Sequence, residues 1–316
     1  MSRKIAYLRN FLPLIGLTLF AYIIWRAGIH NILKVLIKMN SFYLFLAFII
    51  FIPRIFISTY KWQMIAKKQG IDVDLLYMVK INLIGLFYGT ITPLWIGDAI
   101  RIFYLKEKSK KSMGKCMSNF VIDQLIEFFS LFILAIIGSI LLINIFPKLF
   151  TTLLVIFVTI LTIVLLLKNG KIGRKFFSLV YGFILPQKFR NKIKDYSNEF
   201  YKDMPSLKFL MIPLLIEIFS YSLFFVQIYI VAIALHIYAP LTAFLFIYPV
   251  ASLIGQIPIT ISGFGTRESA LIKLFSIYEI DASKIVALSL TSYVITFLIP
   301  ALIGMYYSFR IKLKFE

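Results

Sequence analysis

Long apolar runs, separated by short basic segments, dominate the sequence. A membrane-spanning helix needs about 20 mainly apolar residues, and the candidate spans are residues 11–25, 41–60, 118–143, 149–167, 208–235 and 284–308. Two further apolar stretches, 76–97 and 241–262, differ because Gly and Pro interrupt each near one end and a short charged segment follows. The pattern predicts an all-α polytopic membrane bundle that forms a single transmembrane domain over 1–316.

The basic residues lie mostly between the apolar runs. Residues 101–115 carry six basic residues and one acid, and residues 168–208 carry ten basic and three acidic residues. The connections 144–148 and 236–240 are almost uncharged. Because cytoplasmic loops hold the excess of Lys and Arg, we expect both basic segments on the cytoplasmic side and both neutral connections outside.

Eight full spans from a cytoplasmic N-terminus would place both basic segments outside, against the charge rule. Treating 76–101 and 241–275 as re-entrant hairpins places them inside, since irregular backbone is tolerated at membrane depth where it is buried in protein or lines a wet cavity. We therefore predict six full spans and two hairpins, with both termini on the cytoplasmic side of the cell membrane; eight full spans are the alternative. Segment 26–40 is basic yet falls outside, so we expect an interfacial helix there.

This topology contains an inverted repeat. A span, a hairpin and a span over about 41–143 are followed by the same order over about 208–308, which enters the membrane from the opposite side. Broken helices at matching positions of inverted repeats are typical of transporter binding sites; the alternative is chance, because Gly and Pro are common in membrane helices. The polar stretch 168–207 interleaves aromatic and basic residues, which predicts a cytoplasmic amphipathic linker on the membrane surface.

Composition supports a membrane location and excludes several chemistries. Hydrophobic residues make up 60% of the chain and charged residues only 15%, whereas soluble domains carry about 25% charge. The net charge of +20 suits anionic lipid headgroups, so we expect no nucleic-acid partner. The sole cysteine, Cys116, allows no disulfide, and His30 and His236 stand apart from acidic clusters. We expect no metal and no cofactor. The N-terminal run lacks a small-residue cleavage site, which indicates a retained helix rather than a signal peptide.

The two hairpins share one set of residues: a proline, a Gly-x-x-x-Arg spacing and an acid. These are Pro93, Gly97, Asp98 and Arg101 in the first hairpin and Pro258, Gly263, Arg267 and Glu268 in the second. Gly and Pro break a helix, the new helix start favours an anion, and an arginine one turn in can grip a phosphate. The set predicts two half-sites for a phosphate-bearing headgroup. Alternatively, each arginine is an interfacial topology anchor paired with its acid.

Further ionisable residues fall within predicted membrane segments: Arg54, Asp123, Glu127 and Glu217. Such groups usually face a partner or a cavity. Asp123 and Glu127 share a helix face and could attract a cation or a proton; we favour salt bridges to Arg54 or Arg101. Gly85-x-x-x-Gly89 favours close helix packing. The sequence has no Walker loop, no HExxH and no Ser/His/Asp set, so we expect no enzyme.

The second hairpin resembles the C-terminal motif of the lysylphosphatidylglycerol synthase transmembrane-region family, also called the flippase-like membrane proteins. The matching residues are Pro258, Gly263, Gly265 and Glu268 for that motif, Pro93, Gly97, Asp98 and Arg101 for an earlier family element, and loosely Arg54 and Trp62 for an Arg…Trp pair. The family often has Glu-Arg after the first hairpin, where this chain has Asp123 and Glu127 without the arginine.

The resemblance implies a membrane unit that moves a lipid or a lipid-linked group across the bilayer. We expect no soluble aminoacyltransferase or glycosyltransferase domain, so aminoacyl transfer is not implied. The main hypothesis is a translocator of a phosphate-bearing lipid held by Arg101 and Arg267, with Asp98 and Glu268 positioning them. One alternative is a non-transporting subunit that recruits a separate soluble glycosyltransferase; another is a membrane-embedded transferase acting on polyprenyl-phosphate.

Overall fold

The computed structural model describes residues 21–175, 187–257, 265–311 and 313. Within these ranges all regular elements are helical, as predicted. In chain order they are α2 (Ile29–Ile37), α3 (Ser41–Lys68), α4 (Leu75–Ile91), η1 (Pro93–Ala99), α5 (Ile100–Ser109), α6 (Met113–Leu141), α7 (Pro147–Lys168), α9 (Gln187–Lys202), α10 (Leu207–Ala234), η2 (Ala243–Ile247), α11 (Tyr248–Gly255), α12 (Thr266–Phe275), η4 (Ser276–Tyr278), α13 (Ala282–Tyr293), η5 (Val294–Leu298) and α14 (Ile299–Arg310).

Five of these helices are long and apolar enough to cross a membrane. They are α3, α6, α7, α10 and the continuous run of α13, η5 and α14 over Ala282–Arg310, each of 22 to 29 residues. They coincide with five of the six predicted spans, while most of the first, 11–25, lies outside the described residues. Polar side chains start three of them: Asn40, Ser112 and Ser206 each accept a hydrogen bond from a backbone N–H of the first turn, which satisfies a donor that the helix leaves open.

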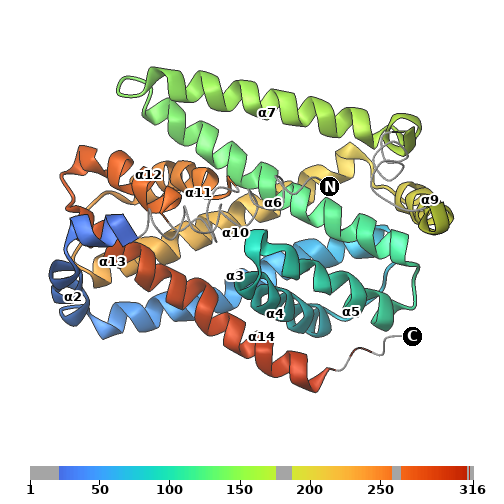
Figure 1. Ribbon diagram of the computed structural model, residues 1–316, viewed down its shortest axis with the longest axis horizontal. Helices are drawn as coiled ribbons and strands as arrows, with labels where there is room; N and C mark the ends of the chain where they lie inside the picture. Colours follow the sequence, from blue (N-terminus) through green and yellow to red (C-terminus); the bar gives the residue numbers. More distant parts are fainter. Residues whose placement is uncertain (1–20, 176–186, 258–264, 312, 314–316) are drawn as a thin grey trace.

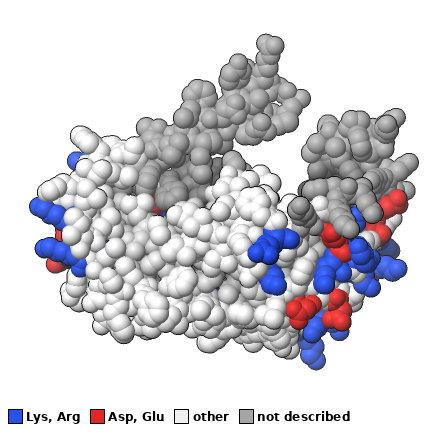
Figure 2. All heavy atoms as spheres, turned by 90° about the horizontal axis from the view of Figure 1, so that it is seen from below, with Lys and Arg blue, Asp and Glu red and all other residues white. Residues whose placement is uncertain are grey.

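The long helices run along the long axis of the molecule (Figure 1). The α5–α6 connection, α9 and the end of α14 lie at one end, and α2 and the α6–α7 connection lie at the other. An ion pair of 2.7 Å between Lys115 and Asp203 joins the two basic segments, so these share one side, as predicted. Figure 2 shows charged side chains at both ends of the long axis and a nearly uncharged band between them, the distribution expected of a membrane protein.

Segment 26–40 lies at the end opposite the basic segments, as the predicted topology requires. It contains the short helix α2, and the backbone N–H of Asn40 donates to the carbonyl of Ala234 at 2.8 Å. His236 contacts the carbonyl of Lys38 at 3.1 Å, which places this segment beside the neutral 236–240 connection. Of the predicted linker 168–207, α9 packs against α6, and residues 176–186 lie outside the described residues.

The first broken segment has the predicted arrangement of helix, break and short helix; in the second, α11 and α12 flank residues 258–264, which lie outside the described residues. α4 has 17 residues and Ala243–Gly255 is also shorter than the spanning helices. α4 starts where α3 ends, and α5 leads into α6 at the same end of the molecule (Figure 1). The second broken segment lies between α10 and α13, whose connecting ends are at the opposite end of the molecule. This arrangement agrees with two hairpins rather than eight full spans, and the repeat relation between 41–143 and 208–308 stays a prediction.

The first hairpin turns at Thr92, where Pro93 prevents α4 from continuing. The hydroxyl of Thr92 donates to the carbonyl of Tyr88 at 2.7 Å and accepts from the N–H of Gly97 at 2.8 Å. A side chain at Gly97 would overlap the carbonyl of Tyr88. Trp95 sits in the left-handed backbone region at a φ of 57°, which is uncommon for a bulky residue. The turn is therefore tightly built.

Gly138 of α6 is expected to tolerate no larger residue. A Cβ atom there would overlap the backbone carbonyl of Phe246 in η2, so Gly138→Val must separate two packed helices. Overpacking of this kind costs about 1–3 kcal/mol or more, and we expect a lower melting temperature in detergent. Gly170→Ala is the control, since a Cβ there would lie 3.4 Å from the flexible end of the Arg174 side chain. Equal melting temperatures for the two variants would contradict this packing.

Candidate functional site

A cavity of about 740 Å³ lies among α3, α4, η1, α6, α10, α11 and the α13–η5 run. Aromatic residues and polar groups share its walls, which is the usual composition of a ligand site. Both hairpins contribute to it: Asp98 and Arg101 come from the first and Arg267 from the second. The charged residues that line it are Arg54, Asp98, Arg101, Glu127, Glu217 and Arg267. The structure thus brings the two predicted arginines to one cavity.

Arg101 of α5 is almost fully buried, with 2% of its surface exposed. Its guanidinium pairs with Asp98 at 2.5 Å and with Asp123 of α6 at 3.3 Å. The rings of Trp62 and Phe120 lie 4.9 and 5.0 Å from it, distances suited to cation–π contact. The predicted pairing with the neighbouring acid and the salt bridge from Asp123 are confirmed. The side chain is enclosed by protein, and the alternative role of Arg101 as an interfacial topology anchor stays a prediction.

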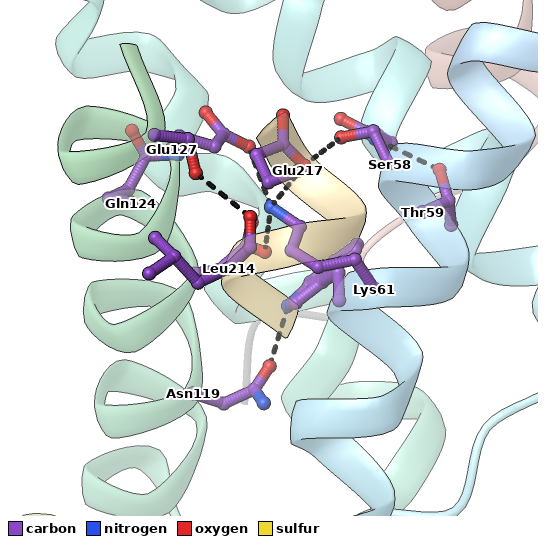
Figure 3. A network of polar contacts seen from close by, with 12 residues as sticks. Ser58, Thr59, Lys61, Asn119, Gln124, Glu127, Leu214 and Glu217 are labelled. Atoms are coloured by element: carbon purple, nitrogen blue, oxygen red, sulfur yellow. Dashed lines mark hydrogen bonds and ion pairs between the residues drawn. The ribbon is translucent and has the colours of Figure 1, made fainter. Parts of the chain in front are cut away.

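Lys61 stands at the centre of the charged cluster, and the sequence analysis missed it. Its Nζ lies 2.7 Å from Asp123, 3.1 Å from Glu217 and 3.3 Å from Glu127, and its side chain is fully buried. Figure 3 shows Glu127 and Glu217 converging on it from α6 and α10. The predicted span ended at residue 60, whereas α3 continues to Lys68. The spacing of the charged residues could have indicated Lys61, because it follows Arg54 by seven residues and so lies on the same helix face.

The cluster holds more carboxylates than cations. Lys61 and Arg101 face four acids, which are Asp98, Asp123, Glu127 and Glu217. Glu127 is the most accessible of the three acids around Lys61, with 27% of its side chain exposed. Water in the cavity can therefore hydrate Glu127, which lowers the free-energy cost of the excess negative charge. The same excess would cost far more in contact with hydrocarbon.

Glu268 organises the start of α12 in the second hairpin. It is fully buried and accepts from the N–H of Gly265 at 2.6 Å, from the Ser289 hydroxyl at 2.5 Å and from Arg267 at 3.0 Å. Gly265 has a φ of 92°, which glycine adopts without strain. Arg267 also donates to Ser289 at 2.8 Å. The predicted Arg–acid pairing is confirmed; Pro258 and Gly263 lie outside the described residues.

Gly85 and Gly89 bring α4 against the returning arm of its own hairpin. A Cβ at Gly85 would lie 2.7 Å from Cγ of Arg101, and one at Gly89 would lie 2.6 Å from the ring of Trp95. The predicted close packing is therefore present, but its partners are the side chains of the hairpin. Gly85 leaves space for the side chain of Arg101, and Gly89 leaves space for the ring of Trp95.

Arg54 of α3 differs from the other arginines of the cavity. Its guanidinium lies 5.3 Å from the ring of Phe51 and 4.9 Å from that of Phe224. Its Nε is buried without a hydrogen-bond partner, and it forms no ion pair with any residue that the structure describes. Asp123 therefore pairs with Arg101 and Lys61, and Glu127 pairs with Lys61. The predicted salt bridge to Arg54 is not formed by either acid.

These features define a multi-pass integral membrane protein built around a cavity with buried charges. The sequence matches the family described as lysylphosphatidylglycerol synthase TM region over residues 13–304, and the chain belongs to this family. It is 27% identical to the UPF0104 membrane protein MJ1595 of Methanocaldococcus jannaschii over 303 residues, which cover 91% of this chain and 89% of that protein. It is 20% identical to the UPF0104 membrane protein PH1989 of Pyrococcus horikoshii, with 93% and 94% covered.

Proposed function

We propose that this protein is a translocator of phosphate-bearing lipids, which passes the headgroup through the cavity while the acyl chains stay in the bilayer. The observation that carries the proposal is the 740 Å³ cavity between the hairpins, with arginines from both hairpins in its wall. A charged headgroup crosses hydrocarbon only at a high free-energy cost. A polar cavity at membrane depth lowers that cost by replacing the water that the headgroup loses.

The chemistry of the walls suits a lipid headgroup. Arg54, Arg101 and Arg267 place guanidinium groups in the cavity wall, and Asp98 and Glu268 hold Arg101 and Arg267 in place. Phe224 and Phe297 supply apolar wall for the glycerol and the first carbons of the chains. Family membership supports a membrane role connected with lipids. The sequence has no Walker loop, so we expect a concentration gradient or removal of the product to drive net movement.

Purified protein in liposomes is expected to speed the exchange of a fluorescently labelled phospholipid between leaflets, measured by chemical quenching of the outer leaflet. Ser252→Phe fills the cavity from α11 and should slow exchange at least tenfold. Val155→Phe is the control, because Val155 of α7 is 64% exposed and does not line the cavity. Lipid exchange by this variant should proceed at the wild-type rate. Wild-type protein that performs no better than empty liposomes would contradict the proposal and favour the partner-subunit hypothesis.

A further inference from the structure

We propose that Arg54 is the residue that binds the phosphate of the translocated lipid, and that Arg101 and Arg267 build the cavity around it. This inference rests on the proposed function and assigns the phosphate to one side chain. Sequence reasoning placed the phosphate on the hairpin arginines. The described structure shows that the three arginines of the cavity wall differ in the partners they already have.

Both hairpin arginines already form ion pairs with acids of the same chain. Arg101 donates to Asp98 and Asp123, and Arg267 donates to Glu268. A phosphate that bound either guanidinium through these atoms would displace a buried carboxylate, which would then lie unpaired in a medium of low dielectric. Their pairs therefore favour a permanent structural role, with the positive charge already balanced inside the protein.

Arg54 has its positive charge in the cavity wall and no carboxylate bound to it among the described residues. Its Nε is buried and lacks a hydrogen-bond partner. A buried polar group without a partner is costly, and a phosphodiester supplies the acceptor oxygens that a guanidinium fork matches. The geometry points to an anion that arrives from outside the chain.

Phe51 and Phe224 hold the guanidinium for this purpose. Both rings lie within about 6 Å of it, the range of cation–π attraction, at 5.3 and 4.9 Å. Aromatic contact stabilises the charge without using its N–H donors. The side chain is thus placed before the lipid arrives, which lowers the entropy cost of binding.

Glu217, which lines the same cavity as Arg54, is already bound to other groups. Glu217 accepts from the Ser58 hydroxyl at 3.2 Å and pairs with Lys61 at 3.1 Å. Arg54 therefore acts on the acidic cluster only through space, where it partly offsets the excess of carboxylates. That offset is the competing, structural role for Arg54, and a binding experiment separates the two roles.

The experiment measures binding of a short-chain phosphatidylglycerol and of the diacylglycerol with the same chains to purified full-length protein in detergent, by native mass spectrometry. Arg54→Gln should weaken phosphatidylglycerol binding by about tenfold or more and leave diacylglycerol binding unchanged. Arg54→Lys keeps the positive charge but loses the planar fork of N–H donors. Its affinity for phosphatidylglycerol should therefore lie between those of wild type and Arg54→Gln. Arg310→Gln is the matched control, since Arg310 lies 5.3 Å from the ring of Tyr306 outside the cavity.

Equal phosphatidylglycerol affinity in wild type, Arg54→Gln and Arg310→Gln would overturn the assignment. Loss of both lipids in Arg54→Gln would also overturn it, because Arg54 would then maintain the shape of the cavity. The proposed function is tested apart from this by lipid exchange in liposomes. Arg54-dependent binding without exchange would refute translocation alone, and undiminished exchange by Arg54→Gln would refute the phosphate assignment alone.

Discussion

Lys61→Met is expected to leave little folded protein in detergent. The ammonium of Lys61 is the shared cationic partner of three carboxylates within 3.3 Å, and Met keeps most of the length of the side chain but removes the charge. Removing one partner of a buried ion pair costs about 3–5 kcal/mol, and here three acids lose the same partner. Total stabilities are about 5–15 kcal/mol, so the loss should appear as a strong fall in the monodisperse fraction on size-exclusion chromatography and in melting temperature.

Two comparisons make this result specific to the cluster. Lys208→Met removes an exposed lysine at the start of α10 and should behave as wild type. Adding Glu217→Gln to Lys61→Met should restore part of the stability. Without Lys61, Asp123 still pairs with Arg101 and Glu127 is still partly hydrated. Glu217 is the acid that would be left charged and buried, and the glutamine removes that charge. A Lys61→Met protein that melts like Lys208→Met would show that the cluster contributes little to the fold.

Glu268→Ala is expected to have the second largest effect. The substitution removes the acceptor of the Gly265 N–H and leaves Arg267 without its buried carboxylate. Loss of a helix cap costs about 1 kcal/mol and an unpaired buried charge costs about 3–5 kcal/mol. The melting temperature should therefore fall steeply, and limited proteolysis should cut near the start of α12.

Glu268→Gln isolates the contribution of charge. Its amide oxygen can still accept from the Gly265 N–H, so its stability should lie between those of wild type and Glu268→Ala. Asp72→Ala, an exposed position in the α3–α4 connection, is the control and should melt as wild type. If Glu268→Ala matched Asp72→Ala, the second hairpin would not depend on this carboxylate.

Hydrophobic pattern was sufficient to predict the helical bundle, and charge was sufficient to predict that the two basic segments lie together. Span length comes from bilayer thickness, and loop charge comes from the membrane's asymmetry, so both are local properties of the sequence. The same holds for the breaks, because Pro93 and Gly97 act on the backbone at their own positions. The ends of helices were less accurate: α3 runs to Lys68 and not to residue 60, since amphipathic turns continue a helix beyond its apolar section.

The partners of the buried charges could not be read from the sequence alone. Arg101 is 22 residues from Asp123, and Lys61 is separated from Glu217 by more than 150 residues. Only tertiary packing brings such pairs together. The free guanidinium of Arg54 was hidden for the same reason, because a lack of partners emerges only once every neighbour has been placed. Sequence reasoning therefore found the charged residues that line the cavity but not how they pair with one another.

The central claim is that a phospholipid headgroup enters the cavity, and photo-crosslinking tests it most directly. Protein in nanodiscs is irradiated with a phospholipid that carries a diazirine in its headgroup, and adducts are mapped by peptide mass spectrometry. The account predicts adducts on the cavity-lining parts of α3 and α10, such as Ser58 and Ser220, and their loss in Ser252→Phe. Adducts confined to the outward face of α7 and to the two ends of the molecule would contradict it.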